Sequence, residues 1–548
     1  GHLNFDDFRF YDQPPVSIEP AAGAWRSILN PLLQHLVPTA VAVDPKQPGS
    51  ETVAQMFVPE GFSVDVIAAE PDLHQPMAFT FDAMGRLWVV EGHSYPQKRP
   101  DGEGLDRILI FADNDHNGTF ETRTTFIEGL NLVSGMEVGH GGIWVGAAPE
   151  LLFIPDRDGD DKPDSEPIVL LDGFGFADTH ETLNSFMWGP DGWLYGNQGV
   201  FNSSQIGKPD TSNQDRTYLA AGVWRYHPTQ HVFEVFSHGG SNQWGLDYDE
   251  HGQIFMTYCR SFWGRGDVTH VMRGGHYWNQ VNSGYAPFIS TQALPGRPWM
   301  TNYQLASQRY GHGEGGSGKP GAREVYGGHS HVGTMIYLGD NWPSEYRNHL
   351  FTHNLHGHQM NHVINRRQAG GYNSVHAGYD TLFCADQQYI GIDLQCGPDG
   401  AVYFSDWYDS RHCHNPNMEQ WDRGNGRMYR MKFDATYKPA VVDYITATDE
   451  QLVAAQLHPN EWHVRTSRLV LADRATSRKI APAAVEQLKS MAMKNEDPVR
   501  RLRAIWTLHC IAQLDDELIS VLFKDQSEYV RAWAVQLVTH AAGPPDVH

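Results

Sequence analysis

Short stretches in which apolar and polar residues alternate recur along the first 440 residues, and each is broken by a turn rich in Asp and Gly. Two of them are FTFDAMGRLWVVEGHS at 79–94 and SFMWGPDGWLYGNQG at 185–199. SNQWGLDYDEHGQIFMTY at 241–258 and IDLQCGPDGAVYFSDWYD at 392–409 repeat the pattern. Alternation with a period of two is typical of half-buried strands, and Asp-Gly turns join antiparallel strands. Each stretch therefore predicts a β-hairpin.

Two looser versions of the same unit lie at 134–154 and 335–357, which brings the number of units to six. Their starts are about 50 to 60 residues apart, except for a long insertion between residues 260 and 330. Strand repeats of this size indicate a β-propeller, in which each unit is a four-stranded blade. We therefore predict an all-β six-bladed propeller. A seven-bladed propeller and an irregular β-sandwich with coincidental turns are the alternatives.

The pattern changes near residue 445, where Gly and Pro become rarer and apolar residues recur with helical spacing. Segments such as EWHVRTSRLVLADRA and DPVRRLRAIWTLHCIAQL predict paired helices of the HEAT type. We expect three parts: an N-terminal extension at 1–60 that wraps the propeller, the propeller at 61–440, and HEAT-like repeats at 445–548. We also expect the helical array to continue beyond residue 548.

Charge and cysteine content exclude several classes of protein. The formal net charge is −24, which argues against nucleic-acid binding because phosphate recognition needs a basic surface. No apolar run reaches about 18 residues, so no membrane span is predicted. The five cysteines form no CxxC pair, so no haem is expected within this chain. The pairing of any disulfides is left open.

Two acidic loops carry oxygen ligands at alternate positions, which is the arrangement that a hard cation such as calcium prefers. The first loop, DNDHNGTFE, offers Asp113, Asp115, Asn117 and Glu121. The second, DRDGDDKPD, offers Asp156, Asp158, Asp160 and Asp164. Neither has the Glu of a complete EF-hand, so we expect structural calcium sites of an extracellular kind. A solvated acidic turn is the alternative for each.

In a propeller the ends of the inner strands converge on the axis, so polar residues near them can form one pocket. The candidate catalytic residues are His180, Glu137, Glu91 and Asp406. The candidate substrate- or cofactor-binding residues are His93, His140, Asn184, Ser241, Asn242, His329, His331, His356 and His414. A neutral histidine can accept a proton from a hydroxyl, and converging histidines can instead bind a transition metal. The sequence leaves both open, and for any single histidine a structural role is the commoner one.

Several segments resemble a family of membrane-bound dehydrogenase-like propeller proteins of planctomycete and verrucomicrobial bacteria. They are FVPEGFSVDVIAAEPDLHQPMAFTFDAMGRLWVVE, HETLNSFMWGPDGWLY, MIYLGDNWPSEYRNHLF, GPDGAVYFSDWYD and GNGRMYRM. The resemblance covers about residues 55–545, including the HEAT-like part. Many members of that family carry a C-terminal c-type haem module, for which this chain has no CxxCH motif.

The propeller is more distantly similar to soluble quinoprotein sugar dehydrogenases. That similarity implies six blades, calcium, pyrroloquinoline quinone (PQQ) on the axis and a histidine base, for which His180 is the best match. Asn242 and Gly245 match a second pattern of those enzymes, but Ser241 stands where they have an arginine. A guanidinium is the natural partner of a quinone or carboxylate, so this substitution leaves the occupant of the axis open.

Three functions remain in view. The first is a periplasmic or extracellular dehydrogenase that acts on a sugar or polyol, with PQQ or a transition metal at the axis. The second is a metal-dependent carbohydrate lyase or hydrolase that uses axial His and Glu residues. The third is a non-catalytic scaffold that binds glycan or protein. The expected partners are a small-molecule or glycan substrate, and a protein on the HEAT-like array or a c-type cytochrome.

Overall fold

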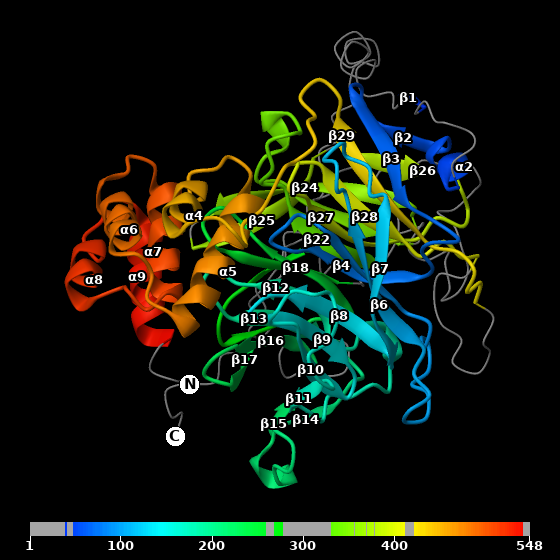
Figure 1. Ribbon diagram of the computed structural model, residues 1–548, viewed down its shortest axis with the longest axis horizontal. Coiled ribbons are helices and arrows are strands. Elements are labelled where there is room, and N and C mark those ends of the chain that lie inside the picture. Colours follow the sequence, from blue (N-terminus) through cyan, green and yellow to red (C-terminus); the bar gives the residue numbers. More distant parts are fainter. Residues whose placement is uncertain are drawn as a thin grey trace, which may run out of the picture.

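The computed structural model describes residues 39–40, 48–258, 268–277, 330–355, 357–368, 370–377, 379–410 and 421–540. These residues form a β-propeller-like arrangement of sheets followed by a C-terminal helical region (Figure 1). His329, His356 and His414 lie outside the described residues.

Four sheets are separate from one another. The first contains β4 (Pro76–Phe81), β5 (Leu87–Glu91), β6 (Asp106–Ala112) and β7 (Thr122–Leu130). The second contains β8 (Val133–Val138), β9 (Gly142–Ala147), β10 (Glu150–Pro155) and β11 (Ile168–Leu171). The third contains β12 (Asn184–Trp188), β13 (Leu194–Gln198), β16 (Gly222–His227), β17 (Val232–His238) and β21 (Gly275–His276). The fourth contains β27 (Gly391–Cys396), β28 (Val402–Asp406), β29 (Arg427–Phe433) and β3 (Phe62–Ala68).

A larger sheet of ten strands joins two groups. One group is β18 (Gln243–Tyr248), β19 (Ile254–Tyr258) and β20 (Val268–Val271). The other is β22 (His331–Ile336), β23 (Leu350–Asn354), β24 (Gln359–Gln368), β25 (Gly371–His376), β26 (Leu382–Cys384), β2 (Met56–Val58) and β1 (Thr39–Ala40). A single parallel pair, Trp244 with Val332, links β18 to β22. A short hairpin of β14 (Ser204–Ile206) and β15 (Thr217–Leu219) stands apart.

The first strands of these groups form a closed ring around a central channel. β4, β8, β12, β18, β22 and β27 contact one another in this order, and β27 contacts β4. Small residues allow the close approach, since a Cβ atom on Gly135 would lie only 2.4 Å from the carbonyl oxygen of Leu183. Hydrophobic clusters fill the spaces between neighbouring sheets, for example around Trp144 and Trp224. The arrangement has the radial packing expected of a propeller.

The Asp-Gly turns hold the inner hairpins in the way that the sequence predicts. In the turn between β18 and β19, Oδ1 of Asp249 accepts the backbone N–H groups of His251 at 2.9 Å and Gln253 at 2.8 Å. Gly252 follows with a φ of +73°, a conformation that glycine adopts at little cost. The predicted hairpins β4–β5, β12–β13, β18–β19, β22–β23 and β27–β28 are all confirmed.

The ring is sealed by a strand from the N-terminal part of the chain. β3 pairs antiparallel with β29, so that Phe62 lies opposite Phe433. The last sheet therefore contains three strands from the end of the propeller-like part and one from its beginning. Earlier still in the chain, β2 extends the ten-stranded sheet by pairing with β26.

The helical region predicted after residue 445 is confirmed. It consists of α4 (Asp449–Ala455), α5 (Glu461–Ser477), α6 (Pro482–Lys494), α7 (Pro498–Cys510), α8 (Asp516–Leu522) and α9 (Glu528–His540), and a further short helix, α2 (Ser50–Val53), precedes β2. Polar caps begin several of these helices, as where the side chain of Asn460 accepts the backbone N–H of Trp462. Among the described residues, no helix combines the length and the apolar character needed to cross a membrane.

The C-terminal helices lie beside the propeller-like part (Figure 1) and contact the turns of the inner hairpins. The Asn460 amide donates to the carbonyl oxygens of Gly397 at 3.0 Å and Pro398 at 3.2 Å. The Trp533 indole donates to the His251 carbonyl at 2.7 Å. The repeated turns thus have a second role, because they provide the surface on which the helices dock.

Candidate functional site

The inner strands start at one end of the channel and finish at the other. At the start of β12, the Asn184 amide donates to the carbonyl of Gln243, the first residue of β18. Near the other end, the Thr80 hydroxyl of β4 donates to Glu137 of β8 at 2.8 Å. A strand of this length spans roughly 17 Å. We call the two ends the His180 end and the α5 end, after the elements found there.

His180 is positioned by the residue two places before it. It lies on a single 3₁₀ turn, Thr179–Glu181, that follows Asp178. Oδ1 of Asp178 lies 3.0 Å from Nδ1 of His180 and also accepts its backbone N–H at 3.3 Å. The Thr179 hydroxyl donates to the Pro96 carbonyl at 2.7 Å and so ties the turn to the first sheet. Because a carboxylate at Nδ1 fixes the tautomer, proton transfer would take place at Nε2.

Aromatic side chains pack beside His180. The Tyr95 ring lies edge-on to it, with 5.9 Å between the ring centres. Tyr95 also contacts Trp407 at 5.6 Å and Trp421 at 5.3 Å. Arg423 donates to the Tyr95 carbonyl at 2.7 Å and to the side-chain oxygen of Gln75 at 3.1 Å. We call Tyr95, Trp407 and Trp421 the aromatic wall.

Two members of the aromatic wall and the neighbouring Gln75 have buried donors that make no hydrogen bond. Within the described part of the chain, the indole nitrogens of Trp407 and Trp421 and the amide nitrogen of Gln75 have no partner. Buried polar groups are nearly always paired with protein, water or ligand. A ligand that carries acceptor oxygens is one of the partners that would satisfy these donors.

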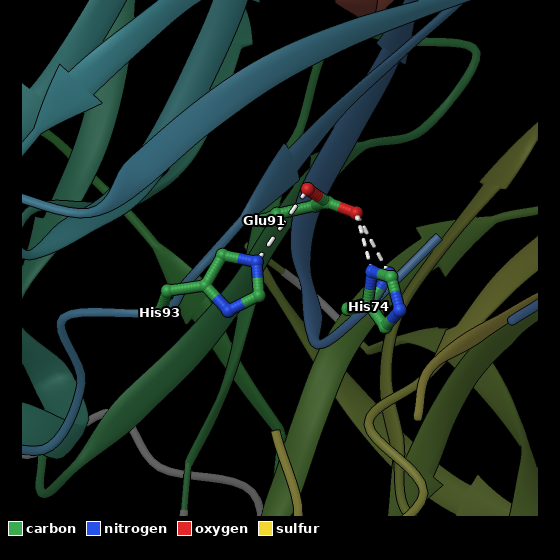
Figure 2. A group of neighbouring side chains, drawn as sticks. All are labelled: His74, Glu91 and His93. Carbon is green, nitrogen blue, oxygen red and sulfur yellow. Dashed lines mark hydrogen bonds and ion pairs between the residues drawn. The ribbon is translucent and has the colours of Figure 1, made fainter. Parts of the chain in front are cut away.

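Glu91 and His93 lie at the same end and form a cluster with His74 (Figure 2). Oε1 of Glu91 lies 3.6 Å from Nδ1 of His74, and Oε2 lies 3.5 Å from Nε2 of His93. Arg107 of β6 also donates to Oε2. Burial acts to raise the pKa of Glu91, but hydrogen bonds from His93 and Arg107 outweigh it and leave the pKa below its usual value. The sequence placed Glu91 and His93 here but missed His74.

Other predicted residues at this end are engaged in structural contacts. Asn184 is fully buried, and its side-chain oxygen Oδ1 accepts the Ser185 hydroxyl at 2.7 Å. His331 contacts Asn361 of its own sheet at 3.1 Å. Asp406 is fully buried and accepts the backbone N–H groups of Ile390 and Tyr408. Ser241 is buried, and Asn242 beside it has a φ of +38°.

Glu137 and His140 lie at the α5 end, away from His180. His140 is in the turn after β8, where its ring packs on Trp188 at 4.9 Å and lies 3.8 Å from Asp473 of α5. Burial lowers the pKa of His140 to about 4 and raises that of Glu137 to about 7. The structure therefore divides the predicted axial residues between two places.

A cavity of about 560 Å³ occupies the channel at the α5 end. Its polar lining includes Thr80, Glu137, Asp247, Asp393 and Arg465. Burial raises the pKa of Asp393 to about 7. The cavity lies between the inner strands and α5, and it is chemically distinct from the His180 end because it lacks the aromatic wall.

The two acidic loops bring most of their predicted ligands together. One carboxylate oxygen each of Asp113, Asp115 and Glu121 lie within 4.8 Å of one another. The same holds for Asp156, Asp158 and Asp164. Asn117 is near the first group, since its amide donates to Asp115 at 3.0 Å. In the second loop Asp160 instead contacts Lys162 at 3.1 Å.

Sequence reasoning missed His74, Tyr95, Asp178, Trp407, Trp421 and Arg423. Asp178 had a local signal, because it stands two residues before His180 and can cap the turn that carries it. Tyr95 follows β5 and Trp407 follows β28. In the sequence, an aromatic residue just after a strand cannot be told apart from one that belongs to the hydrophobic core. Only the ring closure brings Tyr95 next to Trp407.

The fold and the His180 end thus define a propeller-like protein with a partly exposed histidine–carboxylate pair beside an aromatic wall. A family described as a domain of unknown function, DUF7133, matches residues 48–435. The chain belongs to this family. A comparison with curated proteins found no significant match.

Solved structures with a similar chain path include several sugar dehydrogenases. The PQQ-bound aldose sugar dehydrogenase of Streptomyces coelicolor has 15% identity and a TM-score of 0.41, with 68% of this chain and 99% of that chain covered. The apo-form soluble aldose sugar dehydrogenase of Escherichia coli has 14% identity and a TM-score of 0.39, with 68% and 99% covered. The holo PQQ domain of pyranose dehydrogenase from Coprinopsis cinerea has 14% identity and a TM-score of 0.39, with 69% and 97% covered. Since one fold can host many chemistries, the function has to be argued from the site itself.

Proposed function

We propose that this protein is an oxidoreductase that removes hydrogen from a sugar or polyol at the His180 end. The observation that carries the proposal is the 3.0 Å contact between Nδ1 of His180 and Oδ1 of Asp178 beside the aromatic wall. His180 would take the proton of a substrate hydroxyl at Nε2, and Asp178 would stabilise the imidazolium that forms. Aromatic rings offer the apolar faces against which sugar rings pack.

Oxidation also needs an acceptor for the hydride, and the quinoprotein resemblance implies PQQ. PQQ is a planar quinone with several carboxylate groups. The described residues fit such a ligand, because the aromatic wall is next to Arg423 and to the buried donors of Gln75, Trp407 and Trp421 that have no hydrogen-bond partner. When bound, PQQ supplies a two-electron acceptor. The residues of this chain would hold its carboxylates, position the substrate hydroxyl and accept its proton.

The experiment reconstitutes the chelator-treated protein with PQQ and Ca²⁺ and measures dye reduction with a panel of aldoses and polyols. PQQ binding is followed separately by fluorescence. We expect PQQ-dependent dye reduction that His180→Gln abolishes while PQQ binding remains. His231→Gln is the matched control, because this ring contacts Tyr226 at 3.0 Å in the turn between β16 and β17. Absence of both PQQ binding and dye reduction would contradict the proposal.

The same assay separates the two alternatives. A lyase or hydrolase built on His and Glu would act on a polysaccharide without PQQ or dye. A scaffold would bind glycan without turnover. Neither has an observation in its favour as direct as the contact between His180 and Asp178.

We further propose six blades, with the ten-stranded sheet counted as two. The ring of β4, β8, β12, β18, β22 and β27 supports this number. The proposed parts of the chain remain an extension at 1–60, the propeller at 61–440 and HEAT-type helices at 445–548. The contacts of α4 with α5 and of α6 with α7 are compatible with HEAT-type pairs.

We also propose that the acidic loops bind structural calcium and that the protein works in the periplasm or outside the cell. The convergence of three carboxylates in each loop supports calcium binding. Addition of Ca²⁺ after chelation is expected to raise the melting temperature of the wild type. The double variant Asp113→Asn and Asp156→Asn is expected to lose this response.

A further inference from the structure

Three potential metal ligands meet at the edge of the first sheet. His74 precedes β4, Glu91 ends β5, and His93 follows two residues later. Because Pro76 pairs with Glu91 across the two strands, both histidines lie beside the same carboxylate. Nδ1 of His74, Nε2 of His93 and the oxygens of Glu91 form the cluster in Figure 2, and one ligand atom from each lies within 4.8 Å of the others.

Hydrogen bonds from the His74 backbone and from Arg107 hold the Glu91 carboxylate in place, and the rings of His74 and His93 lie beside it. Glu91 is fully buried, and its Oε1 accepts the backbone N–H of His74 at 2.7 Å. Arg107 donates to Oε2 from the neighbouring strand β6. A ligand whose orientation is set by such outer contacts needs little reorganisation to bind a metal.

His74 provides a second, independent observation. Its Nδ1 is buried and makes no hydrogen bond, although it points at Glu91 from 3.6 Å. The two imidazole rings lie 6.1 Å apart between centres and keep about a fifth of their side-chain surface exposed. The cluster therefore lies near the surface, although Nδ1 of His74 itself is buried.

We propose that His74, Glu91 and His93 form a binding site for a divalent transition metal ion of the Zn²⁺ type. Two imidazoles and one carboxylate are a ligand set for Zn²⁺ and its neighbours, whereas Ca²⁺ and Mg²⁺ prefer oxygen ligands alone. Three protein ligands would leave at least one position for water. Arg107 is a positioning residue here, since it acts through Glu91.

The site would tie together two segments that form the wall of the His180 end. Gln75 follows His74 and accepts from Arg423, and Tyr95 lies two residues after His93 against His180. An ion that joins His74 to His93 would fix the position of both segments. This inference does not depend on the reaction at His180, because the ligands and the ion are independent of any substrate.

The experiment titrates the chelator-stripped full chain with Co²⁺ and then Zn²⁺, in millimolar Ca²⁺ to saturate the acidic loops. Visible absorption of bound Co²⁺ reports nitrogen ligation, and calorimetry gives stoichiometry and affinity. We expect one equivalent to bind to the wild type. His93→Gln and His74→Asn should each weaken binding at least 100-fold, while the matched control His231→Gln should leave it unchanged.

Arg107→Met tests the positioning role without removing a ligand. It should lower the affinity about 10- to 100-fold at unchanged stoichiometry. A crystal of the wild type soaked with Zn²⁺ gives a measurement that needs no variant, through anomalous scattering at the zinc edge. A peak between the three side chains supports the proposal. No peak there, or equal Co²⁺ binding by the wild type and the His74→Asn/His93→Gln double variant, overturns it.

Discussion

Arg465 of α5 donates to Asp247 of β18 across 2.7 Å and so joins the C-terminal helices to the inner ring. Its second nitrogen donates to the Tyr248 carbonyl at 2.9 Å, and its guanidinium lies 3.7 Å from the centre of the Tyr248 ring. The Asp247 carboxylate also accepts the Ile336 N–H from the next strand at 2.7 Å. One ion pair thus connects a helix with two strands of the ring, at the α5 end of the channel.

Replacement of Arg465 by Met is expected to reduce the free energy of unfolding by about 2 kcal/mol. The change leaves the Asp247 carboxylate, whose side chain is only 10% exposed, without its cation. Urea denaturation measures the loss. The control Arg157→Met removes a pair with Asp164 at 3.8 Å, in which the Arg157 side chain is 65% exposed, and should cost less than about 0.5 kcal/mol. Equal losses would show that the Arg465 pair contributes no more than a surface contact.

Two glycines with nearly the same φ allow the cost of backbone strain to be measured separately from the cost of displacing the docked helices. Gly252 has φ +73° and Gly274 has φ +72°. A Cβ atom on Gly252 would lie 2.5 Å from Trp533 of α9, whereas one on Gly274 would meet nothing within 4 Å. Gly274→Ala should therefore cost about 1 kcal/mol from strain alone. Gly252→Ala should cost about 3 kcal/mol, because the helices must also shift.

Thermal and urea unfolding of the two glycine variants provide the measurement. Limited proteolysis adds a specific readout, since a loosened helical region should be cleaved faster in Gly252→Ala only. If both variants lose the same stability and are cleaved alike, the turn of β18 and β19 is not a docking surface of consequence.

Asp406→Asn should stabilise the protein at alkaline pH. Burial raises the pKa of Asp406 to about 7 from an ordinary value of 3.8, against the hydrogen bonds from Ile390 and Tyr408. The folded chain thus keeps a proton that the unfolded chain releases, so its stability falls as the pH rises from about 4 to about 7. Asn keeps an acceptor for the two N–H groups and does not ionise. We expect a gain of roughly 1 to 2 kcal/mol at pH 8.

Urea denaturation at pH 4, 6 and 8 checks this expectation. The gain should be smallest at pH 4, where the folded chain keeps the proton and the unfolded chain, near its ordinary pKa of 3.8, has released only part of it. The exposed Glu103→Gln serves as a control and should show no such trend. A stability difference that is the same at all three pH values would mean that folding does not change the pKa of Asp406.

Asp178→Asn should lower kcat about 100-fold with little change in KM, once a substrate is known. Asn removes the charge that stabilises the imidazolium of His180 and weakens the control of its tautomer. Steady-state kinetics measures the split, and the melting temperature verifies the fold. A raised KM at unchanged kcat would instead assign Asp178 to substrate binding.

The hairpins could be predicted because their signals are local. Alternation sets the strands, and an aspartate such as Asp249 closes its own turn within four residues. The distribution of site residues could not be predicted in the same way. Glu91 ends the second strand of a hairpin and Glu137 lies near the end of a first strand, so the two face opposite ends of the channel.

The position of a residue within its hairpin would have separated these two groups. In contrast, no local sequence pattern predicts the aromatic wall or the position of His74 beside Glu91. Tyr95 and Trp407 come from sheets at opposite ends of the chain, and they meet only because β27 returns to β4. Long-range closure of this kind depends on the packing of all intervening sheets.

The pairing of Phe62 with Phe433 has a consequence for synthesis on the ribosome. The strand that completes the final sheet, β3, is made early, and its partner β29 leaves the ribosome after all the other described strands. In the nascent chain, the backbone N–H and C=O groups of β3 that bond to β29 must therefore stay unpaired until β29 has emerged. We expect the pairing of β3 with β29 to be a late step of folding. Removal of the residues up to Ala68 deletes β3 and should leave the ring unclosed between the last sheet and the first.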